Sequence, residues 1–139
     1  MSRADASLIL GKVSSIQRAV ARAREEYAAA GAGFATDRTR QDAAVLNILR
    51  ACESALDLAN ILVRQRRLGV PQSGRDSFRL LAETGAIDAA VSERLQRMIG
   101  FRNVAVHQYQ ALELAVVESI LRRDLDDVLA FATQVAKAG

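Results

Sequence analysis

Apolar residues recur at helical spacing over most of this 139-residue chain, and few residues interrupt the pattern. Pro71 is the only proline, and most of the eight glycines lie in or beside short breaks. Long periodic runs joined by short breaks predict helices that pack against one another in alternating directions. We therefore expect an all-α, up-and-down bundle of four or five helices, with residues 1–139 forming a single domain.

Five segments carry the helical pattern. They cover about residues 4–29, 38–67 and 75–83, a segment that begins near Asp88 as a plausible N-cap, and residues 113–137. The side chains expected to face the core from the first two segments are Leu8, Ile9, Val13, Ile16, Val20 and Tyr27, then Val45, Leu46, Leu49, Leu56 and Val63. Half of the residues are apolar and only 4% are aromatic, which favours helices over a β-sandwich.

Composition also limits the function. The formal net charge of +3 permits a nucleic-acid partner without requiring one. One cysteine and one histidine exclude the usual structural zinc sites, so we expect no metal and no cofactor, and Cys52 is expected to be a small buried side chain. No stretch is long and apolar enough to span a bilayer, and the apolar patch 8–10 is too short for a signal peptide. We expect a cytoplasmic protein with no membrane partner.

The chain's chemically versatile residues gather in the string RNVAVHQY, which holds Arg102, Asn103, His107 and Tyr109. Histidine can both give and take protons near neutral pH. Arginine offers a permanently charged planar fork that suits phosphate. The combination indicates phosphate-ester chemistry or nucleotide handling. A packed structural histidine flanked by valines is the alternative.

The helical wheel places Arg102 in the middle of an apolar stripe made of Leu95, Met98, Ile99, Ala105 and Val106. Buried charge is costly unless it is paired, so this arginine needs a partner. The wheel for the 38–67 segment puts Glu53 and Asn60 within its apolar face, Asp42 in line with them and Asp57 at the edge. We predict that Glu53, with Asp57 as a second candidate, faces Arg102 or His107 and fixes the arginine or orients the imidazole. The alternative is a buried ion pair that only holds two helices in register.

The string GFRNVAVHQY, residues 100–109, resembles the R-x4-H-x-Y signature of the HepT toxins in the HEPN superfamily. Residues 41–60 resemble the second helix of that family, with acidic positions at Glu53 and Asp57, and residues 68–87 resemble its middle region. The resemblance covers most of the chain. It implies a HEPN-like helical homodimer that acts as a metal-independent ribonuclease toxin, with the motif at the dimer interface.

The same resemblance assigns roles to the motif. Arg102 and His107 would be the catalytic pair. Tyr109 would be the residue to which a minimal nucleotidyltransferase antitoxin transfers AMP. Metal-free cleavage of RNA through its 2′-hydroxyl needs a general base and a general acid, and each chain has one histidine. A symmetric dimer would supply both from two copies of His107, while Arg102 stabilises the phosphorane and Asn103 bonds the phosphate or His107.

Two other classes of function stay open from the residues. One is a non-catalytic subunit that helps a nucleotidyltransferase hold its nucleotide or substrate. The other is a helical dimer in which the motif is purely structural. Two arginine clusters, at 64–67 and 122–123, are explained by helix-end charges more simply than by contact with RNA.

Overall fold

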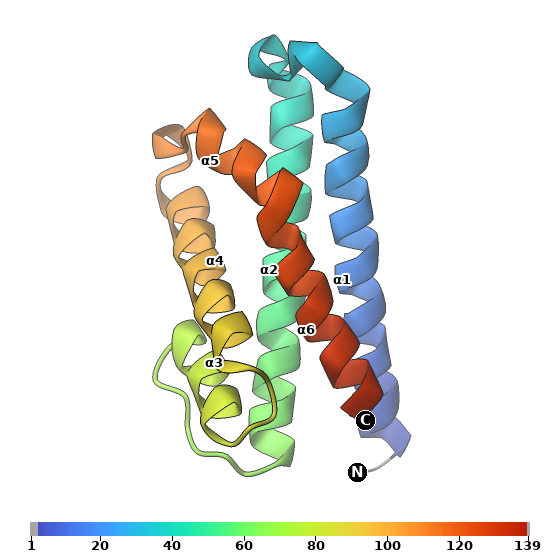
Figure 1. Cartoon of the computed structure of the whole chain (residues 1–139), viewed down its shortest axis with the longest axis vertical. Helices are drawn as coiled ribbons and strands as arrows, with labels where there is room; N and C mark the ends of the chain where they lie inside the picture. The colour runs from blue at the N-terminus through green and yellow to red at the C-terminus, as the bar shows by residue number, and fades with distance from the viewer. Residues whose placement is uncertain (1–2, 139) are drawn as a thin grey trace.

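Two long antiparallel helices, α1 (Arg3–Ala30) and α2 (Arg38–Gln65), form the centre of the molecule (Figure 1). The structure is a computed structural model and describes residues 3–138. The chain continues through α3 (Gly74–Glu83), α4 (Ala89–His107), α5 (Leu114–Ser119) and α6 (Leu125–Ala138). No strand occurs between residues 3 and 138, which confirms the predicted all-α, up-and-down bundle. None of these helices could cross a membrane.

The turn between α1 and α2 is built from glycine and one aromatic anchor. Gly31 has a φ of +56°, a left-handed conformation that glycine adopts without a side-chain clash, and α1 ends just before it. A 3₁₀ helix (Gly31–Thr36) then buries Phe34, whose ring meets Tyr27 edge-on with the ring centroids 4.9 Å apart. The Asp37 side chain accepts a hydrogen bond from the backbone N–H of Arg40 and caps α2.

The predicted helix over 113–137 is one continuous helical segment with a π-helical turn (Ile120–Asp124) between α5 and α6. A π turn inserts a residue into the helix and rotates the side chains that follow it. Beyond it, Leu125, Val128 and Phe131 are buried. The Phe131 ring meets Phe78 of α3 edge-on, with the ring centroids 5.5 Å apart. This contact packs α6 against α3.

Most of the predicted core is correct. On α1 and α2, Ile9, Val13, Ile16, Val20, Val45 and Val63 are buried, and Tyr27, Leu49 and Leu56 are partly buried. The predictions for Leu8 and Leu46 are wrong, because both side chains are exposed. Helix α2 packs against α1 on one side and against α3, α4 and α6 on the other. Its buried positions hold small side chains, such as Cys52, as well as large ones, such as Ile48 and Leu62.

Asp88 occupies the N-cap position of α4, as expected, in an extended conformation. Its side chain makes no capping hydrogen bond. Instead, the carboxylate accepts a hydrogen bond from the Gln134 side chain of α6, with the nitrogen and oxygen 3.2 Å apart. This acid therefore links the start of α4 to the end of the chain.

Candidate functional site

The last turns of α4 carry the motif that the sequence singled out. Leu95, Met98, Ile99 and Ala105 are buried, as the wheel predicts. Val106 is half exposed, so its predicted place in the buried stripe is wrong. Helix α3 covers the first half of α4, and the final turns extend beyond it (Figure 1). The end of α4 is therefore anchored on one side and open on the other.

Arg102 is fixed by a carboxylate from α2. Its Nε donates to Glu53 Oε1 at 2.5 Å, so of the two partners predicted for this carboxylate, Arg102 and His107, Glu53 contacts the arginine. Its Nη1 donates to Asn103 Oδ1 at 3.0 Å. The side chain is 28% exposed, and Nη2 forms no hydrogen bond with any residue in the described range 3–138. The arginine is held by two nitrogens and offers the third to a ligand.

Asp57, the second candidate partner, does not contact the motif. Its carboxylate pairs with Lys12 of α1, with the nitrogen and oxygen 3.0 Å apart. Asn60 is exposed and accepts a hydrogen bond from the Ser77 hydroxyl of α3 at 2.5 Å. The prediction that Asp57 faces Arg102 or His107 is therefore wrong, because α1 supplies a nearer cation on that side of α2.

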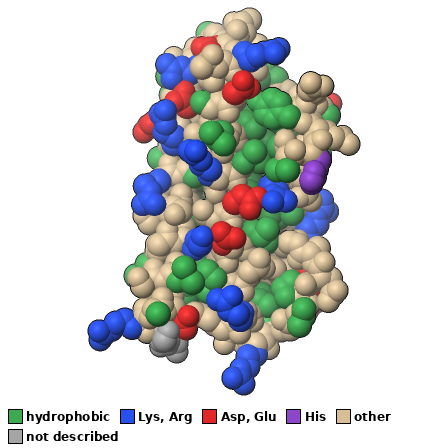
Figure 2. All heavy atoms as spheres, turned by 180° about the vertical axis from the view of Figure 1, so that it is seen from behind, with side chains coloured by type: hydrophobic (Ala, Val, Ile, Leu, Met, Phe, Trp, Pro, Cys, Tyr) green, Lys and Arg blue, Asp and Glu red, His purple; other side chains and the backbone are tan. Residues whose placement is uncertain are grey.

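His107 is the last residue of α4 and is exposed. Between residues 3 and 138, no side chain forms a hydrogen bond or an ion pair with its imidazole. The single histidine, purple in Figure 2, stands at one edge of a face that also carries basic and acidic side chains. Neither Glu53 nor Asn103 orients this ring within one chain, since both contact Arg102. Both ring nitrogens are available to a substrate or to a second copy.

Tyr109 lies in a short 3₁₀ turn (Tyr109–Ala111) and is 44% exposed. Its hydroxyl donates a hydrogen bond to Asp42 of α2. Burial, followed by the hydrogen bond and the negative charge of Asp42, raises the pKa of Tyr109 to about 12, while the charge of Arg38 opposes the rise. The helical wheel places Asp42 in line with Glu53, and the structure gives it Tyr109 as its partner.

Gly100 has a side-chain neighbour that explains its place before the motif. A Cβ atom built on it would lie 2.6 Å from Nη2 of Arg75, an α3 residue. The missing side chain therefore lets a guanidinium lie directly against α4.

Cys52 lies on α2 next to Glu53 in the sequence and is 2% exposed, as expected for a small buried side chain. Burial, with a smaller contribution from the charge of Glu53, raises the pKa of its thiol to about 12. Within the described part of the chain, no three His, Cys, Asp or Glu residues come together in a way that could hold a metal ion. The chemistry available at this site is that of Arg102, His107 and their neighbours.

The fold and this site define a class of protein: an all-α bundle that presents an arginine and a histidine, five residues apart, at the open end of its fourth helix. A comparison with family models identifies the group within that class. The model for the HepT-like ribonucleases matches residues 16–135, and the chain belongs to this family.

Individual relatives agree with this assignment. The mRNA nuclease HepT of Shewanella oneidensis is 42% identical over 120 residues, which cover 86% of this chain and 90% of that protein. A tri-AMPylated Shewanella oneidensis HEPN toxin, solved in complex with an MNT antitoxin, superposes with a TM-score of 0.90 at 39% identity and 100% coverage of both chains. A chain from a toxin–antitoxin crystal structure with AMP-PNP gives a TM-score of 0.90 at 40% identity, covering 96% of this chain and 99% of that one.

Proposed function

We propose that this chain is the toxin of a toxin–antitoxin module and acts in the cytoplasm as a metal-independent endoribonuclease. Residues 1–139 work as one domain. One observation carries the proposal: Glu53 and Asn103 hold Arg102, while no residue between 3 and 138 forms a hydrogen bond with its Nη2 or with the imidazole of His107. Membership of the HepT-like ribonucleases supports the reaction type.

The reaction needs two copies of the chain. One His107 removes the proton from the 2′-hydroxyl of RNA, and that oxygen attacks the adjacent phosphorus. The second copy's His107 protonates the departing 5′-oxygen, so the proton balance closes without a metal. Arg102 donates to the phosphorane oxygens as negative charge develops on them. Since each chain has one histidine, the active unit is a homodimer with its motifs at the interface.

Glu53 and Asn103 are positioning residues in this scheme. The carboxylate and the amide oxygen occupy Nε and Nη1 of Arg102, which restricts the guanidinium to one orientation. A preoriented donor stabilises charge without having to reorganise during the reaction. Asp57 has no part in the proposal, because it pairs with Lys12.

Regulation falls on Tyr109. A nucleotidyltransferase antitoxin binds ATP, the tyrosine oxygen attacks the α-phosphorus, pyrophosphate leaves and the phenolic proton is released. The attached AMP brings a negative phosphate toward Arg102 and adds bulk beside His107, which blocks RNA by charge and by size. The tri-AMPylated state of the Shewanella oneidensis toxin supports this proposal.

A His107→Ala variant tests the ribonuclease proposal. We expect RNA cleavage to fall by about 10²–10⁴-fold, because the general acid and base are lost together. Growth arrest on expression should disappear as well. A variant that cleaves RNA as fast as the wild type would refute the proposal. A wild-type protein that binds its nucleotidyltransferase only with nucleotide, and cleaves no RNA, would favour the non-catalytic subunit.

A further inference from the structure

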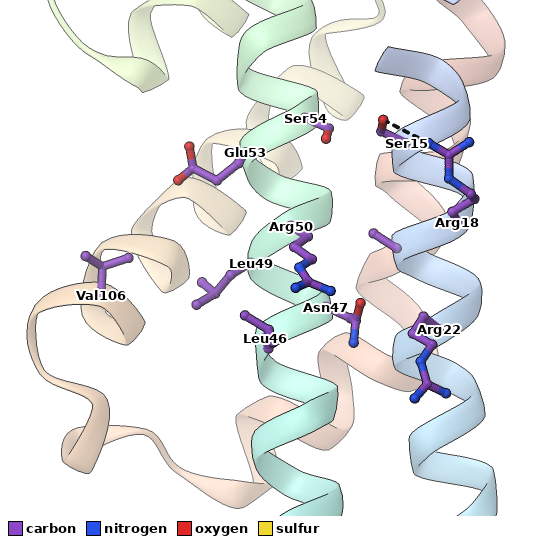
Figure 3. A pocket seen from close by; sticks show the side chains of 11 residues that line it. Ser15, Arg18, Arg22, Leu46, Asn47, Leu49, Arg50, Glu53, Ser54 and Val106 are labelled. Carbon is purple, nitrogen blue, oxygen red and sulfur yellow. Dashed lines mark hydrogen bonds between the residues drawn. The ribbon is translucent and has the colours of Figure 1, made fainter. Parts of the chain in front are cut away.

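An open groove of about 750 Å³ crosses α2 from the end of α4 to α1 (Figure 3). On the α4 side it is lined by Val106 and by Glu53. On the α1 side it is lined by Arg18 and Arg22, with Arg50 of α2 between the two sides. We call this feature the α1–α2 groove.

The groove is continuous with the candidate catalytic site. Glu53, at its α4 side, is the residue that holds Arg102. Val106 is the sequence neighbour of His107, and its side chain also lines the groove. A chain bound at Arg102 and His107 can therefore pass directly over Glu53 and across α2.

Two of the three groove arginines lack a carboxylate partner. Arg50 makes no hydrogen bond or ion pair within residues 3–138. Arg18 contacts only hydroxyls, those of Ser14 at 2.6 Å and Ser15 at 3.4 Å. Arg22 differs, because it pairs with Glu26 at 2.7 Å and Glu25 at 3.3 Å. Arg18 of α1 and Arg50 of α2 therefore both line the groove without an ion pair to any residue in the described part of the chain.

The groove is also lined by apolar side chains that are exposed. Leu46 and Val106 contribute large exposed surfaces, and Leu49 is partly exposed between them. Among the residues that the structure describes, no aromatic side chain lines the groove. Base stacking on rings is the usual source of affinity for single strands beyond charge. Its absence means that a nucleic acid here would be held mainly through its phosphates.

We propose that the α1–α2 groove binds the RNA strand on one side of the scissile phosphate, with Arg18 and Arg50 each contacting a backbone phosphate. The proposal rests on RNA being the substrate, as set out above. Because phosphates carry no base identity, this contact tolerates any sequence and depends steeply on salt. The arginines at 64–67, at the far end of α2, have no part in it.

The test measures binding of a fluorescein-labelled 2′-O-methyl oligouridine, which lacks the attacking hydroxyl and stays intact. Fluorescence anisotropy gives the association constant over a range of KCl concentrations. In the double variant Arg18→Ala/Arg50→Ala, the slope of log K against log salt should become shallower by about 1.4, or about 0.7 for each lost phosphate contact. The control Arg64→Ala/Arg66→Ala removes the same charge and should keep the wild-type slope. Arg18→Lys/Arg50→Lys should restore it.

Three results would overturn the groove proposal. The first is a wild-type slope in the double alanine variant, and the second is an equal loss of slope in the control. The third is a double variant that becomes monomeric by sedimentation and regains the slope at concentrations where the dimer re-forms. That result would assign the groove to contact between copies of this chain.

Cleavage of unmodified RNA separates this inference from the proposed function. If the wild type cleaves RNA but the double alanine variant keeps the wild-type salt slope, the groove proposal is refuted and the ribonuclease proposal stands. A wild-type protein that cleaves no RNA, but whose slope depends on Arg18 and Arg50, refutes the ribonuclease and leaves the groove as an RNA-binding site.

Discussion

Glu26 and Glu53 both pair with arginine, but their surroundings differ. Glu26 on α1 is 4% exposed and uses both oxygens, accepting from Arg22 at 2.7 Å and from Arg40 at 2.6 Å. The Glu53 side chain is 46% exposed, and one of its oxygens contacts Arg102. Glu26, whose two oxygens both bind arginines of the same chain, serves to join helices. Glu53 is half exposed, and it can orient an arginine that binds another molecule.

Among the changes that test this comparison of Glu26 and Glu53, Arg102→Ala should have the largest effect, and that effect is on catalysis. RNA cleavage should fall by about 10²–10³-fold, since a charged donor to the phosphorane is lost. The Tm should change little, because the released Glu53 is already half hydrated. Initial rates and thermal denaturation check this. Arg97→Ala, which removes an exposed arginine paired with Glu93 at 3.7 Å on the same helix, is the matched control. If Arg102→Ala lowered the Tm without lowering the rate of RNA cleavage, the ion pair between Arg102 and Glu53 would have only a structural role.

The next effect is on stability. Glu26→Gln leaves Arg22 and Arg40 against a neutral amide in a buried position, so the Tm should fall by several degrees. Cleavage per folded molecule should stay the same. Glu25→Gln, which loses only an exposed contact with Arg22, should hardly change the Tm. Reduced cleavage by folded Glu26→Gln protein would contradict the separation of the two regions.

At acid pH, the wild type should lose the extra stability that Glu26 gives it over the Glu26→Gln variant. The hydrogen bond from Arg40, opposed by burial, lowers the pKa of Glu26 below its ordinary value of 4.5 in the folded state. Its contribution to the free energy of unfolding is therefore complete above about pH 4.5 and lost as the pH falls through the folded-state pKa. Urea unfolding of the wild type and of Glu26→Gln, repeated from neutral to acid pH, measures the difference between their free energies of unfolding. If this difference in the free energy of unfolding stays constant as the pH falls, the charge of Glu26 is not its cause.

The smallest effect concerns Asp42, a carboxylate of α2 that accepts a hydrogen bond from Tyr109 instead of pairing with an arginine. Asp42→Asn should lower the pKa of Tyr109 from about 12 only part of the way toward 10, because burial, the largest cause of the shift, remains. Phenolate absorbance during alkaline titration measures this in a Tyr27→Phe background, where Tyr109 is the only tyrosine. Asp57→Asn, which disrupts the pair with Lys12, is the control. An unchanged pKa would show that Asp42 contributes nothing to the shift.

Helical periodicity was sufficient to predict the bundle, and it predicted that Glu53 faces either Arg102 or His107. Glu53 and Arg102 lie on arcs that are otherwise apolar, and a charge in such a position needs a partner from another helix. The contact between Tyr109 and Asp42 was within reach of the same reasoning. Asp42 and Glu53 are eleven residues apart, about three turns, and so share one face of α2.

The wrong predictions came from packing that one helix does not encode. A wheel gives the apolar side of α2 but not which neighbour lies against each part of it. Lys12 of α1 therefore took Asp57 away from the motif. Leu46 and Val106 are apolar and yet exposed, because no described helix covers the surface near the end of α4. Both side chains line the groove to which we assign RNA.

The buried thiol of Cys52 gives this molecule an internal reporter. A protonated thiol out of contact with solvent does not react with alkylating reagents, and it becomes reactive only when the surrounding helices separate. The rate of alkylation of the native chain therefore measures how often α2 opens behind the pair formed by Glu53 and Arg102. Since the chain has one cysteine, no engineered label is needed to follow that opening when RNA or a partner binds.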